Sequence, residues 1–365
     1  MTLVLEDRHV QALMPMNRCI EAMEIAYKDY ASSGTVNIPR IRYRSDTSEP
    51  DTVYASNIHI GTTPSLDAAA IRLGGSPRSR FPGAQGEQVS QFQNRNWGFI
   101  CLVDMRTGQL LAIVQEFFLS GIRVGATSGL AVKHLASPEA TRVGMYGSGK
   151  LARTDLEAFA LVRNLQHVKI YSPNPQHRLD FAAEMSEKLG IEIEPVSDPK
   201  EAARDVDIVC CATNAGYVSG QPALHGEWLE PGQLLVTLQN SDANFYKTEV
   251  DEVALTRSKS IIINDRESVY SNNQMELLDP IERGVISWDR ITTLAEVVSS
   301  DSPFRSEPDD IVYYKNSTGM GIQMSAACAL IYRDAISQGI GHEIPTEWFG
   351  SDLTEWNERG FFPSS

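Results

Sequence analysis

Apolar residues recur at helical spacing near both ends of the chain and once between them. Residues 5–31 place Val10 and Ile20 on one side of a helix. Small and apolar residues over 120–136 and 318–338 predict two further, buried helices. Both terminal parts of the chain are therefore expected to contribute long helices.

A different pattern separates the first two predicted helices. Residues 35–120 consist of short β-rich runs that alternate with turns. The sequence MRTGQ at 105–109 lies between two such runs and is typical of a hairpin turn. We predict a mostly β or α+β region here.

Strands and helices alternate from Arg142 onward. The runs RVGMY, HVKIYS, DIVCCAT, QLLVTLQ and SIIIND are continuously apolar, as in strands covered on both faces. Strands that alternate with helices predict a parallel sheet with right-handed crossovers. We therefore expect an α/β domain, residues 138–315, inserted between two halves of another domain, residues 1–137 and 316–365. The aromatic tail, 341–365, is expected to pack back on the first region.

The composition narrows the class of protein. The 365 residues are 42% hydrophobic and 22% charged, with a net charge of −15 and no basic run, which disfavours nucleic acid or an anionic membrane as a partner. No apolar run is long enough for a membrane helix, and no signal peptide is apparent. The five cysteines form no CxxC pair, which favours reduced thiols in a cytoplasmic protein.

The sequence GSGKLA, 147–152, carries the most specific signal. Gly147, Gly149 and Ala152 fit the pattern G-x-G-x-x-G/A, which follows a predicted strand and opens a predicted helix. In a Rossmann-type fold this turn places a dinucleotide pyrophosphate on the helix N-terminus. The predicted cofactor-binding residues of the turn are Gly147, Ser148, Gly149, Lys150 and Leu151.

The end of the second strand of the α/β domain, HVKIYS, distinguishes NAD from NADP as the cofactor. An acidic residue there would bind the ribose 2′-hydroxyl of NAD, but the stretch YSPNPQHR has none. Ser172 lies near that place, Asn174 follows it, and Arg178 could pair with a 2′-phosphate. NADP is therefore favoured over NAD. Thr213 and Asn214 end a later strand, where ligands bind in open α/β sheets.

Substrate-binding candidates are arginines in the first domain. Arg72 and Arg123 lie among small apolar residues, so each needs either an internal acid or a bound carboxylate. Arg40 and Arg42 lie on a predicted strand. Asp242 follows a parallel strand, where it is either a catalytic carboxylate facing the cofactor or an ordinary turn residue.

These segments together resemble the ornithine cyclodeaminase/mu-crystallin family. The resemblance is carried by the IPR opening, AIRLGG, VDMRTGQLLAIV, SGIRVGATSGLAVKHLA, RVGMYGSGKLA and KNSTGMGIQMSAACALIY, in that order. It implies a homodimer, a Rossmann domain for NAD(P), and a substrate-binding and dimerisation domain formed by both termini. It also implies chemistry at the Cα–N bond of an amino or imino acid.

The resemblance assigns roles to single residues. Arg123 falls on the arginine that clamps the substrate carboxylate, and Arg40 falls on a second arginine, with Arg42 as a near alternative. Arg72 replaces a lysine, so a second clamp is favoured there over proton transfer. Asp242 is the nearest match to the catalytic base. Ser317 and Gly319 would lie near the nicotinamide, whereas Met324 stands where the family usually has an aspartate.

Three functions remain open at this point. The leading one is an NAD(P)-dependent oxidoreductase acting on a small amino or imino acid, such as a cyclic ketimine carboxylate. The second is a cyclodeaminase, which would convert ornithine to proline and ammonia with NAD as a catalytic cofactor. The third is a binding protein of the mu-crystallin type that sequesters NADP or a small ligand.

Overall fold

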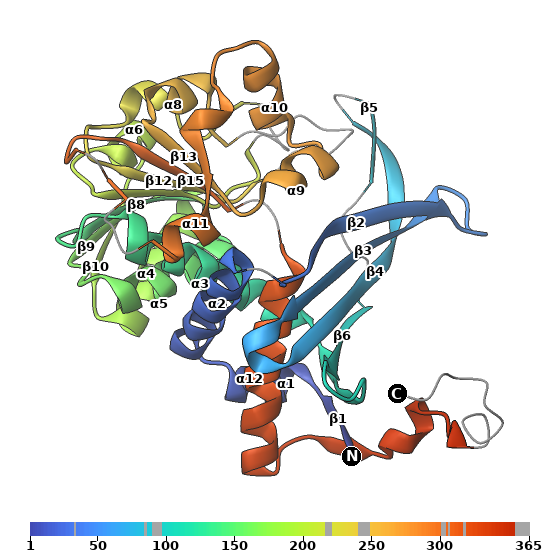
Figure 1. Ribbon diagram of the computed structural model, residues 1–365. Helices are drawn as coiled ribbons and strands as arrows, with labels where there is room; N and C mark the ends of the chain where they lie inside the picture. The colour runs from blue at the N-terminus through green and yellow to red at the C-terminus, as the bar shows by residue number, and fades with distance from the viewer. Residues whose placement is uncertain are drawn as a thin grey trace.

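The computed structural model describes residues 1–32, 34–83, 86–89, 97–215, 221–239, 249–300, 304–305, 307–316 and 319–354. These residues form two separate sheets with helices packed against them (Figure 1). One sheet is mainly antiparallel and the other is entirely parallel. This arrangement confirms the predicted fold class, whereas the domain boundaries at 137/138 and 315/316 remain a prediction.

The mainly antiparallel sheet has the order β16-β1-β7-β6-β4-β3-β2, with β5 paired to β4. The predicted turn at 105–109 is confirmed as the connection between β6 and β7. The strands are β1 (Thr2–Leu5), β2 (Asn37–Asp46), β3 (Thr52–Thr63), β4 (Ala68–Gly83), β5 (Gly86–Val89), β6 (Trp97–Asp104), β7 (Leu110–Gln115) and β16 (His342–Ile344).

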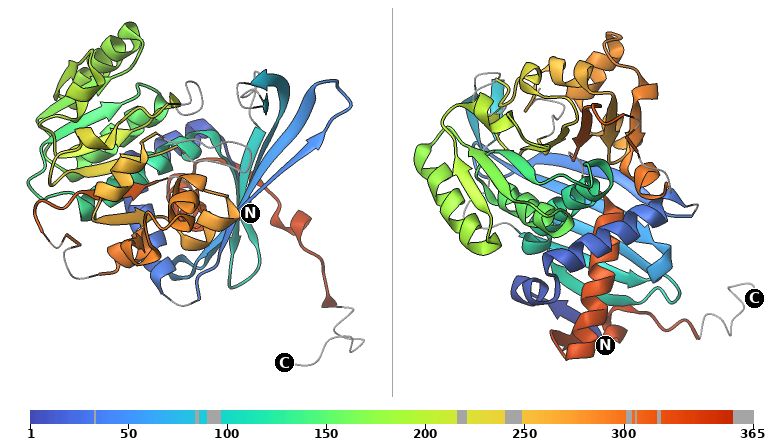
Figure 2. Two further views of the ribbon diagram at one scale, coloured as in Figure 1. Left: turned by 90° about the horizontal axis from the view of Figure 1, so that it is seen from above. Right: turned by 90° about the vertical axis from the view of Figure 1, so that its left-hand side faces the viewer.

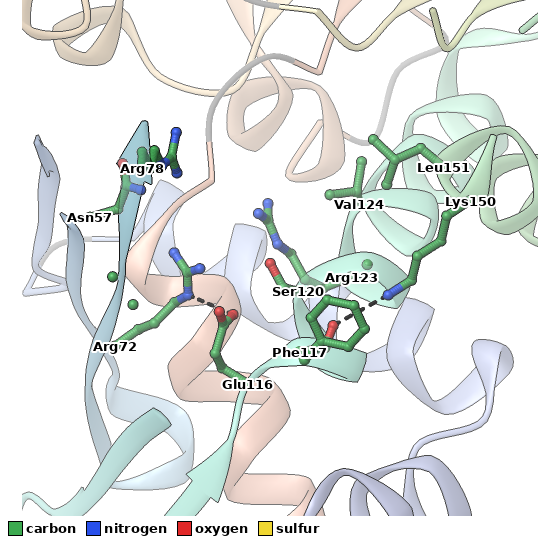
Figure 3. A pocket seen from close by; sticks show the side chains of 13 residues that line it. Asn57, Arg72, Arg78, Glu116, Phe117, Ser120, Arg123, Val124, Lys150 and Leu151 are labelled. Carbon is green, nitrogen blue, oxygen red and sulfur yellow. Dashed lines mark hydrogen bonds and ion pairs between the residues drawn. The ribbon is translucent and has the colours of Figure 1, made fainter. Parts of the chain in front are cut away.

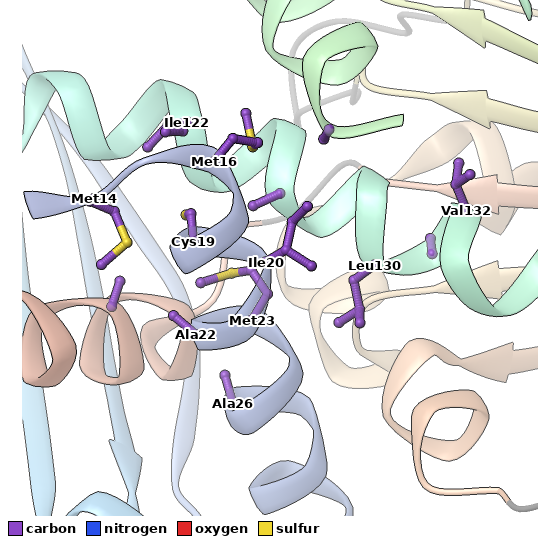
Figure 4. Close-up of a cluster of buried hydrophobic side chains, with 14 of the residues drawn as sticks. Met14, Met16, Cys19, Ile20, Ala22, Met23, Ala26, Ile122, Leu130 and Val132 are labelled. Carbon is purple, nitrogen blue, oxygen red and sulfur yellow. The ribbon is translucent and has the colours of Figure 1, made fainter. Parts of the chain in front are cut away.

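Four of the described helices form the helical layer on this side of the molecule, three of them in contact with the sheet and the third along the chain packed on its neighbouring helices. They are α1 (Asp7–Leu13), α2 (Met16–Ala31), α3 (Phe117–Leu135) and α12 (Gly321–Gln338). The prediction of a single helix over 5–31 is wrong, because Pro15 lacks an N–H and restricts the residue before it, so the helix stops and restarts there. The apolar side of α2 packs on α3 through residues such as Met23 and Leu130 (Figure 4).

Close approach of backbones fixes the position of α12 against β3. A Cβ on Gly61 of β3 would overlap the backbone of Gly321, and a Cβ on Gly321 would overlap the backbone of Ile60. Gly125 of α3 is equally close to Thr154 of α4 (Lys150–Val162). These contacts hold α12 against β3 and α3 against α4, and the candidate site lies beside the N-terminal parts of α3 and α4.

The parallel sheet has the order β10-β9-β8-β11-β12-β15-β13-β14. Its strand β15 was not predicted, although it lies between β12 and β13 with Tyr313 and Tyr314 buried. The strands are β8 (Arg142–Tyr146), β9 (His167–Tyr171), β10 (Glu192–Pro195), β11 (Ile208–Cys211), β12 (Leu234–Thr237), β13 (Ser260–Ile263), β14 (Ile291–Thr293) and β15 (Val312–Lys315). Besides α4, the helices of this part of the chain in the described residues are α5 (Pro175–Leu189), α6 (Pro199–Ala203), α8 (Glu252–Arg257), α9 (Arg266–Ser271), α10 (Met275–Glu282) and α11 (Leu294–Val298).

The end of the chain departs from expectation. Its strand β16 pairs with β1, but the following Trp348 is 71% exposed and Phe349 is also exposed. Within the described residues the tail packs back through β16 and through Thr346, which accepts a hydrogen bond from Oγ1 of Thr2 at 3.2 Å, and the chain up to residue 354 then runs away from the sheet edge (Figure 2). None of the helices in the described ranges has the length and apolar character needed to cross a membrane.

Candidate active site

The glycine turn between β8 and α4 has the geometry that its pattern predicts. Gly147 has a φ of +96°, and a Cβ there would collide with the carbonyl oxygen of Ala212. Gly149 caps α4, and a Cβ on it would meet nothing within 4 Å. The turn therefore exposes backbone and the free N–H groups of α4 to open space, which suits a pyrophosphate.

A cavity of about 1,000 Å³ extends from this turn along the carboxyl ends of the parallel strands. Its walls include the loops that follow β9, β11 and β12. This edge is where open α/β sheets bind ligands. Of the predicted cofactor-binding residues, those that line the cavity are Gly147, Ser148, Gly149, Lys150, Leu151, Ser172, Thr213 and Asn214.

The other predicted cofactor-binding residues lie elsewhere. Asn174 caps α5, with its Oδ1 accepting from the backbone N–H of Gln176 at 2.9 Å. Arg178 donates from Nη1 to the carbonyl oxygen of Ser172 at 2.9 Å, so it supports the end of β9 next to the cavity. Gly319 lies against Arg123 rather than in this cavity. Ser317 lies outside the described residues.

Glu249, which sequence reasoning missed, organises one end of the cofactor cavity. Its buried carboxylate accepts hydrogen bonds from the backbone N–H groups of Thr213 at 2.6 Å and of Leu238 and Gln239 at 2.7 Å each. Burial raises the pKa of the Glu249 carboxyl, although these donors favour the ionised form. One side chain therefore joins the loops after β11 and β12.

A second cavity, of about 350 Å³, lies between β3, β4, α3 and the glycine turn (Figure 3). Lys150 and Leu151 line both cavities, so the two adjoin at the first turn of α4. The residues lining this second cavity are Asn57, Arg72, Gly74, Gly75, Arg78, Glu116, Phe117, Ser120, Gly121, Arg123, Val124, Lys150 and Leu151.

Arg123 is a buried cation in the wall of this second cavity. Its Nη1 donates to Oε1 of Gln323 at 3.0 Å, and the described residues give its Nε no hydrogen-bond partner. Burial, reinforced by the charge of Arg72, lowers the pKa of Arg123 to about 10. A Cβ on Gly319 would lie 2.8 Å from Nη2, so glycine leaves room for the guanidinium. Such a group would be stabilised by an anion in the cavity.

Arg72 has an internal acid as a partner, which is one of the two possibilities that the sequence left open. Its Nε donates to Oε2 of Glu116 at 2.9 Å, and its Nη1 lies 3.0 Å from Nδ1 of His59, its cross-strand neighbour. Burial and the surrounding arginines hold the pKa of His59 well below its ordinary value. The imidazole is therefore neutral, and its Nδ1 accepts from Arg72. The guanidinium is fixed from two sides.

The N-terminal arginines lie near the second cavity without lining it. Arg40 donates from Nε to Oδ1 of Asn272 at 3.1 Å. Arg42 donates from Nε to Oδ1 of Asn57 at 3.2 Å, and Asn57 does line the cavity. The choice between Arg40 and Arg42 as a clamp therefore stays open. Asp242, the proposed base, lies outside the described residues.

Sequence reasoning missed two residues that orient the arginines. Glu116 could have been found as the acid between an apolar strand and an apolar helix. Gln323 had no signal of its own in the sequence. Met324, noted for its departure from the family pattern, is buried, and it is its neighbour Gln323 that contacts Arg123.

Comparisons with known proteins identify the family of this chain. The model of the ornithine cyclodeaminase/mu-crystallin family matches residues 1–339. The Delta(1)-pyrroline-2-carboxylate reductase of Bacillus cereus is 26% identical over 345 residues, covering 94% of this chain and 99% of the relative. The iminosuccinate reductase of Paracoccus denitrificans is 26% identical over 342 residues, with coverage of 94% and 99%.

A solved structure has the same architecture. The Delta(1)-pyrroline-2-carboxylate reductase of Thermococcus litoralis, in complex with NADH and L-proline, superposes with a TM-score of 0.79 at 27% identity. The match covers 94% of this chain and all of that one. The resemblance inferred from the sequence is thus confirmed over nearly the whole chain: the protein belongs to the ornithine cyclodeaminase/mu-crystallin family.

Proposed function

We propose that this protein is an NAD(P)-dependent oxidoreductase that acts on the C–N bond of a small amino or imino acid. One observation carries the proposal: the cavity along the glycine turn adjoins, at Lys150 and Leu151, a cavity lined by Arg72 and Arg123. A dinucleotide in the first and a carboxylate in the second would be neighbours. The activities of the pyrroline-carboxylate and iminosuccinate reductases support this function.

The roles of the arginines follow from their contacts. Arg123 and Arg72 would hold the substrate carboxylate, since guanidinium and carboxylate form paired, charge-assisted hydrogen bonds. Arg72 is already oriented by Glu116 and His59, so it acts as a clamp and not as a proton donor. A bound nicotinamide supplies or accepts the hydride, and the chain contributes position and electrostatics. Asp242 as the base, with Ser317 beside the nicotinamide, belongs to this proposal.

The cofactor we propose is NADP in preference to NAD. Ser172 lines the cavity where an NAD enzyme usually has a carboxylate, and Arg178 is bonded to its carbonyl oxygen. Asp180 also lines the cavity and acts against a 2′-phosphate. Solved relatives were crystallised with NADH or NAD⁺. The preference therefore depends on the balance between these charges.

We further propose a homodimer formed through the outer face of the antiparallel sheet. Ile38, Ile60 and Ile71 are cross-strand neighbours on this face, and Ile71 is 46% exposed. Ile41 and Phe99 are also exposed there. A continuous apolar sheet face usually marks an interface. A related archaeal alanine dehydrogenase is a dimer. The five free thiols support a cytoplasmic location.

Net turnover tests the main proposal. An imino acid with NADPH or NADH should give a loss of absorbance at 340 nm that matches the amino acid formed. Release of ammonia from a diamino acid without any net absorbance change would instead indicate a cyclodeaminase. Tight cofactor binding without turnover of any amino or imino acid would indicate a sequestering protein.

A further inference from the structure

Even with Arg78 set aside, the second cavity carries more positive charge than one carboxylate would balance. Among its lining residues are four cationic side chains and a single carboxylate, and that carboxylate, Glu116, is paired with Arg72. The cations are Arg72, Arg78, Arg123 and Lys150. A substrate with one carboxylate, held by Arg123 and Arg72, would leave Lys150 without an anion.

Lys150 is directed into this cavity by its surroundings. It begins α4, yet its Nζ lies 4.1 Å from the centroid of the Phe117 ring and donates to the carbonyl oxygen of Phe117 at 3.4 Å. A Cβ on Gly121 would lie 2.7 Å from Cε of Lys150, so glycine leaves the path open. Figure 3 shows Lys150 on the opposite side of Arg123 from Arg72.

Those contacts leave the ammonium able to bind a ligand. A 3.4 Å hydrogen bond is long, and an ammonium has three donors. The aromatic ring below it stabilises the positive charge without neutralising it. The ring and the carbonyl oxygen of Phe117, on α3, hold Nζ, so the ammonium points away from the place expected for the pyrophosphate although Lys150 also lines the cofactor cavity.

Resting on the proposed function, we propose that the substrate is an amino or imino acid whose side chain carries a second carboxylate, and that Lys150 binds this carboxylate. Arg123 and Arg72 hold the α-carboxylate at the other side. In the reductive direction the carbon of a protonated imine would accept the hydride that a bound reduced nicotinamide supplies, so that C=NH⁺ becomes CH–NH and the nitrogen keeps its proton. Both carboxylates remain unchanged and serve only for recognition.

Pairs of amino acids that differ in charge but hardly in shape test this substrate class. Aspartate is compared with asparagine, and glutamate with glutamine, in oxidation by NADP and NAD. The wild type should favour at least one acidic member by about tenfold or more in kcat/KM, as expected for a charge-assisted contact. Equal or better turnover of the amides would overturn the proposal. Failure of every amino acid would instead count against the proposed function.

Variants of Lys150 test whether this residue causes the preference for a second carboxylate. Lys150→Met keeps most of the length of the side chain and removes the charge, and Lys150→Arg keeps a positive charge. The Met variant should lose the preference for the acidic member while the Kd of NADPH and NADH, followed by fluorescence, changes less than about twofold. The Arg variant should recover part of the preference. A Met variant that binds the cofactor tenfold more weakly and keeps its preference would place Lys150 on the cofactor phosphates and overturn the assignment.

A binding experiment that requires no turnover accompanies the kinetics. Glutarate and butyrate are titrated calorimetrically into the protein loaded with NADPH or NADH. Glutarate should bind more tightly to the wild type, and Lys150→Met should remove that difference. Equal affinities in the wild type would contradict a second carboxylate subsite.

Discussion

Arg123 on α3 donates a hydrogen bond from Nη1 to Oε1 of Gln323 on α12, at 3.0 Å. Nε2 of Gln323 in turn donates to the hydroxyls of Tyr27 and Thr127, at 3.1 Å each. Side chains from α2, α3 and α12 therefore hold one guanidinium in place. Because its orientation is set before any ligand arrives, binding of a carboxylate costs little further ordering.

Replacement of Arg123 should weaken substrate binding and leave cofactor binding nearly unchanged. Arg123→Ala removes the buried cation, and KM for the amino or imino acid should rise by about 100-fold, since a bidentate charged pair is lost. The Kd of the dinucleotide should stay within about twofold, because Arg123 does not line the cofactor cavity. Steady-state kinetics and fluorescence titration measure the two. A similar loss of both affinities would refute the clamp.

Removal of the Gln323 oxygen that orients Arg123 should raise KM for the substrate less than removal of Arg123 itself. Gln323→Leu keeps the volume but deletes the bond to Nη1, so KM should rise about tenfold while kcat changes less. Ser325→Ala on the same helix is the matched control, because it deletes only a buried hydrogen bond to the carbonyl of Ala68. Equal kinetic effects of the two variants would mean that Gln323 acts only on stability.

The cofactor preference should respond to one residue at the end of β9. Ser172→Asp places a carboxylate in the cavity, so kcat/KM with NADPH should fall by tenfold or more while the value with NADH is kept or improved. The ratio of the two values, measured at one ionic strength, is the readout. A wild type that already prefers NADH would show that Asp180 outweighs Arg178.

A buried acid on α4 should make stability depend on pH. Asp155 is fully buried beside Ser128 and Cys210, and burial raises its pKa to about 7. Between the unfolded pKa of about 4 and this folded value, only the native state binds the proton. As the pH rises through this range, the contribution of Asp155 to stability therefore falls by about 1.4 kcal/mol per pH unit. Asp155→Asn should therefore raise Tm more at pH 7 than at pH 5. A gain that is the same at both pH values would contradict this titration.

The proposed dimer predicts a selective effect on molecular mass. Ile71→Arg places a charge in the apolar sheet face, so light scattering should give half the wild-type mass. Leu161→Arg is the control, since Leu161 is about as exposed as Ile71. It lies on α4, a helix of the parallel sheet, and not on the antiparallel sheet face. If the wild type already had the mass of a monomer, the dimer proposal would be wrong. If both variants dissociated, the interface could not be assigned to this sheet face.

Local patterns allowed prediction of the fold more fully than of the site. The glycine turn and five strands of the parallel sheet follow from contiguous residues, because turn geometry and strand burial are local requirements, whereas β10, β14 and β15 were not predicted. Glu116 and Gln323 were missed because each meets its arginine only through packing, 44 and 200 residues away in sequence. Strand β15 is a four-residue run whose pairing depends on β12 and β13. The break at Pro15, by contrast, was visible locally.

The most direct measurement is absorbance at 340 nm with the purified protein, NADPH or NADH, and a panel of cyclic and acyclic imino acids, including those that carry a second carboxylate. The reverse reaction is run with amino acids, including ornithine and lysine, and ammonia is assayed in parallel. We expect net oxidation of the reduced cofactor, matched by the amino acid formed and lost in Arg123→Ala. Ammonia release without a net absorbance change, or cofactor binding without turnover of any compound, would contradict the account.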